Sequence, residues 1–282
     1  MNVDYHMHTL CSDGRNTVEQ VVEQVKEEQL ESFSIADHDT IDGVEKAREL
    51  CPEPVHFVSG VEITCREVYC KEIDRFVSIH LLGYGFDEHN RGLFELFQER
   101  RRHVAVVFLA LMKELATAGY PVELSNVPIS CGNYLQLRDI LSYVSEKYNP
   151  LPENVKEIID AYYPAMNEAN ISLSKAIYTV KKAGGFTIWA HPFHVYHHFK
   201  KLELSREEVT ALLLFLKQWG LDGIESDYLG FQPEERDFLR ELAKEHGMIC
   251  SAGSDYHGTS SPRNHMGVKT ELKLRPFFEK ED

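Results

Sequence analysis

Apolar residues along the chain fall into two kinds of segment that alternate with each other. Short apolar runs of the strand type occur seven times, at residues 3–6, 32–36, 55–64, 76–84, 186–190, 223–226 and 248–252. Longer segments carry apolar residues three and four positions apart, as the valines within residues 18–25 do. Strands that alternate with amphipathic helices predict an α/β fold with a mainly parallel sheet.

This alternation is interrupted in the middle of the chain. Residues 95–119 carry one long helical stripe, and residues 135–148 and 155–163 carry shorter helical patterns, but no strand pattern occurs there. We therefore expect residues 1–87 and 173–282 to form one strand-and-helix domain. Residues 88–172 are expected to form a helical insertion that covers the C-terminal face of that domain.

Histidine and carboxylate residues recur where the predicted strands end. His6-x-His8 follows the first strand and Asp255-x-His257 follows the seventh, and residues two apart on an extended chain point the same way. Five further candidates occupy comparable positions: Asp13, His38, Glu62, His80 and His191. A lone histidine is more often a surface or hydrogen-bonded residue than a ligand. Nine recurrent donors exceed the needs of one ion, however, and predict a multinuclear metal site.

These ligands come from both halves of the chain and must converge. A closed barrel gathers the carboxyl ends of its strands at one face, whereas an open doubly wound sheet would spread them along a row, so we favour a barrel of about seven strands. Imidazole and carboxylate donors suit Zn, Mn or Fe, and adjacent ions of this kind favour hydrolysis of a phosphoester. The sequence contains no H-E-x-x-H, G-x-S-x-G or Walker-type motif.

Composition narrows the range of partners. The hydrophobic content of 43% and charged content of 27% are typical of soluble globular proteins. No apolar run approaches the roughly 20 residues that cross a bilayer, and the first residues lack the features of a signal peptide. We therefore expect a cytoplasmic protein with no membrane partner. A formal net charge of −15 disfavours binding to duplex nucleic acid. A short oligonucleotide or another small phosphorylated substrate stays possible.

Several segments together resemble the successive motifs of the PHP (polymerase and histidinol phosphatase) superfamily: HMHTLCSDG, ADHDT, GVEIT, His80 before LLGY, WAHP and GSDYHG. Their order and spacing match along nearly the whole chain. The SDG after HMHT and the insertion before the AHP motif are most similar to small bacterial phosphoesterases acting on nucleotides. That branch includes nucleoside 3′,5′-bisphosphate phosphatases and enzymes that trim short RNA from the 5′ end. The resemblance implies a distorted (β/α)7 barrel and two to three divalent metal ions.

The resemblance also implies how the nine ligands divide. His6, His8, Glu62 and Asp255 would surround one ion. Glu62 would bridge to a second ion, also held by His80 and His191, while Asp13, His38 and His257 would hold a third. The implied reaction is hydrolysis of a phosphomonoester of a small molecule, such as a nucleotide or nucleoside 3′,5′-bisphosphate, by a water shared between the ions.

Three alternatives accompany this interpretation. Histidinol-phosphate phosphatases share the ligand pattern but typically carry His where Asp13 stands. An exonuclease that degrades short RNA in the 5′–3′ direction would use the same site. A binding module without catalysis is disfavoured, because every ligand position holds a competent residue.

Substrate contacts are less clearly marked than metal ligands. The nucleotide-acting branch typically carries an arginine just after its AHP motif, but this chain reads HPFHVYHH. His194 is therefore a candidate to contact the phosphate or to act as an acid, against the alternative of a loop histidine facing water. Five arginines are further candidates for substrate binding: Arg100, Arg101, Arg102, Arg138 and Arg263. A solvated helix face is the alternative for the run at 100–102. Asp37 and Asp39 flank His38 and are expected to orient ligands rather than to bind metal.

Overall fold

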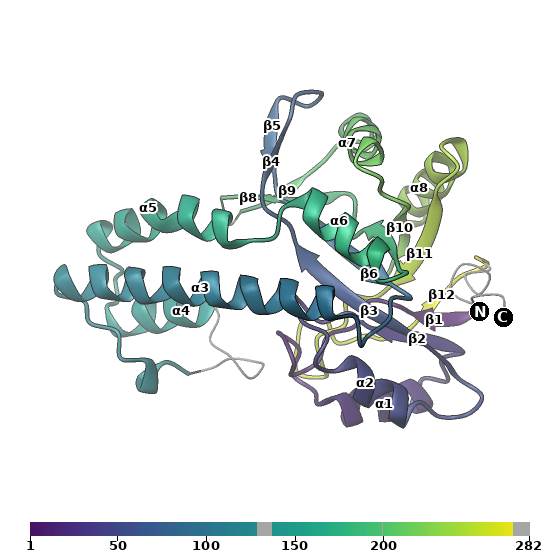
Figure 1. Ribbon diagram of the computed structural model, residues 1–282, viewed down its shortest axis with the longest axis horizontal. Coiled ribbons are helices and arrows are strands. Elements are labelled where there is room, and N and C mark those ends of the chain that lie inside the picture. Colours follow the sequence, from purple (N-terminus) through teal and green to yellow (C-terminus); the bar gives the residue numbers. More distant parts are fainter. Residues whose placement is uncertain (129–136, 199, 273–282) are drawn as a thin grey trace.

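The fold is built around one large sheet, seen in the computed structural model, which describes residues 1–128, 137–198 and 200–272. Its eight strands lie in the order β11-β10-β7-β6-β3-β2-β1-β12 (Figure 1). They are β1 (Asn2–Asp4), β2 (Ser32–Ile35), β3 (His56–Thr64), β6 (His80–Tyr84), β7 (Phe186–Trp189), β10 (Gly223–Tyr228), β11 (Ile249–Gly253) and β12 (Val268–Lys269). The prediction of an α/β fold is confirmed.

The sheet curves until β1 meets β11. The Tyr5 N–H donates to the Ala252 carbonyl at 3.0 Å, and Met7 pairs with Tyr256 in a parallel bridge just beyond the two strands. Seven strands therefore form a nearly closed barrel, as predicted, while β12 pairs antiparallel with β1 at the edge. The interior is filled by a cluster of buried residues that includes Val58, Leu82 and Ile188.

One strand runs against the expected direction. The predicted strand at 76–84 is divided into β5 (Arg75–Val77) and β6, and β6 is antiparallel to both of its neighbours, β3 and β7. β5 instead pairs with β4 (Val68–Cys70) in a hairpin outside the barrel. A second hairpin, β8 (His194–His197) with β9 (Lys200–Glu203), lies beside it through a bridge between Ser78 and Tyr196.

Helices pack around the outside of the barrel. They are α1 (Val18–Glu27), α2 (Val44–Leu50), α6 (Leu173–Lys182), α7 (Arg206–Gln218) and α8 (Pro233–Glu245). In α1 the valine stripe is buried, and Thr17 and Gln20 form a capping box that fixes where the helix starts. These apolar faces join the outward side chains of the sheet in one large core. No helix of the described residues is long and apolar enough to cross a membrane.

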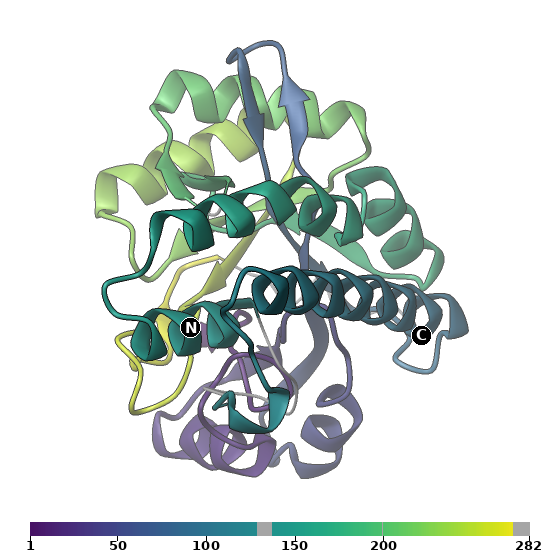
Figure 2. The ribbon, with the colours of Figure 1, turned by 90° about the vertical axis from the view of Figure 1, so that its left-hand side faces the viewer.

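The middle of the chain forms a helical arm. Its elements are α3 (Arg91–Thr117), the short η1 (Leu124–Asn126), α4 (Leu137–Lys147) and α5 (Glu153–Ala169). The first part of α3 packs on the barrel core through Leu93, Leu96 and Phe97. The rest of α3 has its own apolar cluster with α4 and α5. Figure 1 shows the arm extending beyond one end of the barrel, and in Figure 2 α3 and α5 cross in front of that end.

Candidate metal centre

The nine predicted ligands lie together at the end of the barrel that faces the helical arm. The two x-spaced pairs are neighbours, because the chain past β1 runs beside the chain past β11. The His8 N–H donates to the Tyr256 carbonyl at 2.8 Å and the Tyr256 N–H donates to the His6 carbonyl at 3.2 Å. Met7 and Tyr256 are the central residues of the two pairs, and the side chains on either side of each therefore point to the same place.

The first group of ligand atoms is fully enclosed. His6, His8, Glu62 and Asp255 each offer one atom, and these atoms lie within 4.8 Å of one another. Glu62 Oε2 is 3.2 Å from both His6 Nε2 and His8 Nε2. His8 Nε2 is also 3.2 Å from Asp255 Oδ1. These four residues are the ones that the family resemblance assigns to one ion.

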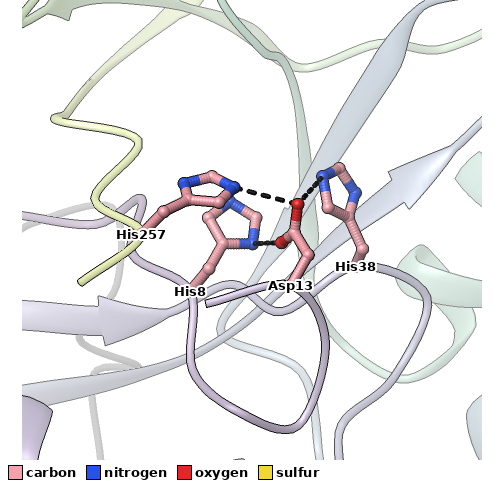
Figure 3. A group of neighbouring side chains, drawn as sticks. All are labelled: His8, Asp13, His38 and His257. Carbon is pink, nitrogen blue, oxygen red and sulfur yellow. Dashed lines mark hydrogen bonds and ion pairs between the residues drawn. The ribbon is translucent and has the colours of Figure 1, made fainter. Parts of the chain in front are cut away.

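A second group shares His8 with the first. Figure 3 shows His8, Asp13, His38 and His257 turned toward one another from three separate segments. Asp13 Oδ2 is 3.1 Å from His257 Nε2, and Asp13 Oδ1 is 3.3 Å from His8 Nδ1. The side chain of His38 keeps 22% of its surface exposed, so solvent reaches this side of the centre.

A third group surrounds Glu62 from the other side. His80 Nδ1 lies 2.9 Å from Glu62 Oε1, and His38 Nε2 lies 3.1 Å from Glu62 Oε2. His191 Nε2 lies 3.2 Å from Glu62 Oε1. The resemblance assigned His80 and His191 to an ion shared with Glu62, and both imidazoles contact the same carboxylate oxygen.

The donor atoms fit divalent cations. Within the described residues, His6 Nε2, His8 Nε2 and Glu62 Oε2 are buried and make no hydrogen bond, although buried polar atoms normally have a partner. All three face the first group, and imidazole nitrogen with carboxylate oxygen is the donor set of Zn, Mn and Fe sites. A cation would satisfy these three atoms together.

Some of the ligands already have the protonation state that binds metal, and others do not. Burial opposes ionisation of Glu62, but His38, His6 and His80 outweigh it and hold the pKa of its carboxyl well below the usual range. Asp255 behaves alike: burial raises its pKa, and His8, His6, His257 and Arg263 together lower it further than burial raises it. Burial lowers the pKa of His38 to about 3. The two acids and His38 are thus in the forms that bind metal. Carboxylates outweigh burial and raise the pKa of His6 and of His8, however, so these two rings must release a proton when metal binds.

Two ligands occupy uncommon backbone conformations. His191 has a φ of 32° and Asp255 has a φ of 57°, in the left-handed region that residues other than glycine rarely adopt. Such conformations persist where the surroundings determine them and cluster at functional sites. The backbone at the ends of β7 and β11 is therefore shaped around the positions of these two side chains.

Glu225 holds two ligands in place, and sequence reasoning missed it. This fully buried carboxylate in β10 lies 2.9 Å from His6 Nδ1 and accepts a 2.7 Å hydrogen bond from the His191 N–H. A carboxylate on the far nitrogen of a ligating imidazole fixes the ring orientation. An acidic residue inside the apolar strand pattern of GIES was the available signal.

Asp37 and Asp39 lie outside the three groups of ligand atoms. Asp37 accepts hydrogen bonds from the Thr9 N–H at 2.7 Å and the Ser12 hydroxyl at 2.6 Å. These bonds fix the loop that carries Asp13. Asp39 accepts from the Thr64 N–H at 3.0 Å and pairs with Arg100.

The candidate substrate arginines differ in their placement. Arg263 lies at the ligands, because its guanidinium contacts Asp255 Oδ2 and lies 2.8 Å from His257 Nε2. Arg100 pairs with Asp39 at 3.0 Å, and Arg101 pairs with Asp42 at 2.6 Å. Arg102 is exposed. The side chain of Arg138 lies outside the described residues.

His194 lies beside the centre rather than in it. Its N–H donates to the His191 carbonyl at 2.8 Å, and its ring is 6.3 Å from that of His191. Burial lowers the pKa of His194 to about 4, with further contributions from Lys201 and His191. The imidazole is therefore neutral near pH 7 and carries one ring N–H that can be donated.

Comparison with known proteins places these features in a family. The sequence matches the PHP domain family over residues 4–258. It is 28% identical to a phosphoribosyl 1,2-cyclic phosphate 1,2-diphosphodiesterase of Eggerthella lenta, over 94% of this chain and 98% of that protein. It is 25% identical to a 5′-3′ exoribonuclease of Haemophilus influenzae, over 90% of this chain and 89% of that protein. A solved structure from Bifidobacterium adolescentis, provisionally described as a metal-dependent phosphoesterase, aligns with a TM-score of 0.65 and 26% identity, over 98% and 94% of the chains.

Proposed function

Because the chain belongs to the PHP domain family and is a metal-dependent phosphoesterase, we propose that it hydrolyses a phosphomonoester of a nucleotide or nucleoside 3′,5′-bisphosphate. The observation that carries the proposal is the position of Glu62. Its two oxygens lie among His6, His8, His38, His80 and His191. One carboxylate is thereby shared by adjacent groups of ligands, as a site for two to three Mn, Zn or Fe ions requires.

The proposed ions would be held by the nine ligand residues. Ions so held stabilise charge on phosphoryl oxygens and lower the pKa of water. Asp13 and His257 lie at the same edge as His38, which is partly open to solvent. We therefore expect the phosphate to approach from this side of the centre.

Arg263 is the arginine that we propose to bind the phosphate. Its guanidinium contacts ligands and still exposes 43% of its side chain, and a guanidinium binds phosphate oxygens through two parallel hydrogen bonds. His194 is proposed to donate a hydrogen bond to the phosphate or to the leaving oxygen, because its neutral ring lies next to His191. The engaged pairs of Arg100 and Arg101 favour a role in holding the arm.

A 5′–3′ exonuclease acting on short RNA is the second candidate. It is supported by exposed aromatic residues on the two hairpins beside the centre. Histidinol phosphate is a weaker candidate, because Asp13 stands where that branch typically carries histidine. The Eggerthella lenta relative adds a cyclic phosphate diester to the substrates worth testing.

The test is phosphate release in the presence of Mn²⁺. Substrates should include nucleoside monophosphates, 3′,5′-bisphosphates, a ribose cyclic phosphate, 5′-phosphorylated RNA and histidinol phosphate. Among the small-molecule substrates we expect the highest kcat/KM on a nucleotide, and we expect loss of activity with chelator and in Asp255→Asn with the fold retained. A folded Asp255→Asn variant with full activity, or no hydrolysis of any of these phosphoesters, would contradict the proposal.

A further inference from the structure

The two hairpins outside the barrel carry exposed aromatic rings next to the metal centre. Tyr69 and Phe76 lie directly opposite each other in the β4–β5 hairpin, with ring centroids 5.1 Å apart. They remain 48% and 53% exposed. Phe76 stacks at 6.4 Å and 19° on His197 of the β8–β9 hairpin. We call Tyr69, Phe76 and His197 the aromatic strip.

The strip is continuous with the site through the residue before His197. Tyr196 pairs with Ser78 by hydrogen bonds of 2.7 and 3.0 Å, which join the two hairpins. The Tyr196 ring stacks on the candidate ligand His80 at 4.8 Å and 19°. Phe76 is four residues before His80, about 13 Å along an extended chain. An oligonucleotide with its phosphate at the centre is therefore long enough to reach the strip.

Charges of both signs border the strip: Glu67 lies 3.1 Å from His197 Nδ1 and Asp74 accepts from the Tyr69 hydroxyl, while two lysines are placed to hold phosphates. Lys200 lies opposite His197 and Lys201 lies opposite Tyr196 in the β8–β9 hairpin. Both lysines are exposed, and neither forms an ion pair with any residue that the structure describes. Exposed rings beside free cations are the combination that binds single strands, because bases stack on the rings while cations hold the phosphates.

We propose that the aromatic strip, with Lys200 and Lys201, binds the nucleotides that follow the 5′ phosphate of a single-stranded oligonucleotide. This inference rests on the proposed phosphoesterase function. It makes an oligonucleotide the preferred substrate at the same site, since a mononucleotide would leave the strip unused. Tyr69 is held for this role by a 2.5 Å hydrogen bond from its hydroxyl to Asp74.

The first measurement is binding without cleavage. The probe is a fluorescent hexamer of 2′-O-methyl RNA with phosphorothioate linkages, added to the full chain with Mn²⁺. We expect Phe76→Ala to weaken binding about 10-fold, since stacking contributes about 1–3 kcal/mol per base, and Phe76→Trp to preserve it. Tyr178→Ala is the matched control, because Tyr178 in α6 is 63% exposed and lies outside the strip.

The second measurement is hydrolysis. Phe76→Ala should raise KM about 10-fold for a 5′-phosphorylated RNA hexamer, with kcat unchanged and no effect on p-nitrophenyl phosphate. Lys200→Ala with Lys201→Ala should flatten the salt dependence of hexamer binding. Equal hexamer binding by wild type, Phe76→Ala and the Tyr69→Ala, Phe76→Ala double variant would overturn the inference. The inference would also be overturned if the strip variants differed from the wild type in their oligomeric state and in nothing else.

The two readouts separate this inference from the proposed function. If the wild type binds the hexamer through the strip but releases no phosphate from any substrate, the proposed function fails and the strip stands. If it hydrolyses mononucleotides while the strip variants bind the hexamer as the wild type does, the function stands and the strip fails. Circular dichroism and the thermal midpoint check that each variant is folded.

Discussion

Glu62 contacts more of the candidate ligands than a single ion would require. It lies within 3.2 Å of His6, His8, His80 and His191. We predict that Glu62→Gln lowers the metal content by at least one ion per chain, because an amide offers one oxygen and no charge. Phosphate release should fall by at least about 100-fold. Elemental analysis after preparation without chelators measures the first effect, and Glu241→Gln on the exposed face of α8 is the matched control.

Substitution of Glu225 tests whether the orientation of the metal ligands affects metal affinity separately from their identity. Gln at this position keeps the shape but replaces one acceptor with a donor, so the His6 ring or the His191 N–H loses its partner. We predict that Glu225→Gln weakens Mn²⁺ affinity by about 10- to 100-fold. Titration of metal-free protein with Mn²⁺ measures this loss. Unchanged affinity in a folded variant would show that Glu225 is only a packing residue.

The contrast between these two glutamates shows what the sequence could predict at this scale. The ligands repeat a pattern, a donor near a strand end, and the x-spaced pairs share a direction whatever the fold. Glu225 belongs to no repeat. Its two partners lie 219 and 34 residues away in the chain, and only the closed barrel brings them together. The positions of the arginines depend on tertiary contacts in the same way.

At the level of elements, the main difference between the predicted and the observed fold is the direction of β6. An all-parallel reading would place His80 at the far end of the barrel, because His80 starts its strand. No helical pattern separates Thr64 from His80, and a parallel neighbour needs a crossover of a dozen or more residues, usually a helix. The chain returns through the β4–β5 hairpin instead, so β6 is antiparallel and its first residue lies among the ends of the other strands.

Close packing of β11 against the ligands gives a prediction for this element. A Cβ on Gly253 would lie 2.3 Å from His6 Cβ and 2.6 Å from Glu225 Oε1. We predict that Gly253→Ala destabilises the fold by about 1–3 kcal/mol and weakens metal binding, because His6 must move. Urea unfolding measures the first effect. Gly92→Ala in α3 is the control, since its nearest neighbour is the side chain of Asn90, and a similar loss there would contradict the argument.

For the whole molecule, the helical arm connects two strands that are neighbours in the barrel. The arm begins after β6 and ends before α6, which leads into β7. The sequence did not indicate how the arm is attached. Arg100 Nη2 lies 3.0 Å from both Asp39 Oδ2 and Asn170 Oδ1. One side chain of α3 thus joins the loop after β2 to the end of α5.

From this connection we predict that selectivity depends on an arginine that need not touch substrate. If Arg100 keeps the arm in front of the centre, removing it should affect large substrates more than small ones. We predict that Arg100→Met combined with Asp39→Asn raises KM for the preferred nucleotide substrate about 10-fold while p-nitrophenyl phosphate is hydrolysed as before. The pair is changed together because a lone Asp39 would be a buried charge without its partner. Arg102→Met removes an exposed charge from the same helix and should leave both KM values unchanged. Equal losses on the two substrates in the double variant would mean that the contact supports the centre itself, and that the arm does not select the substrate.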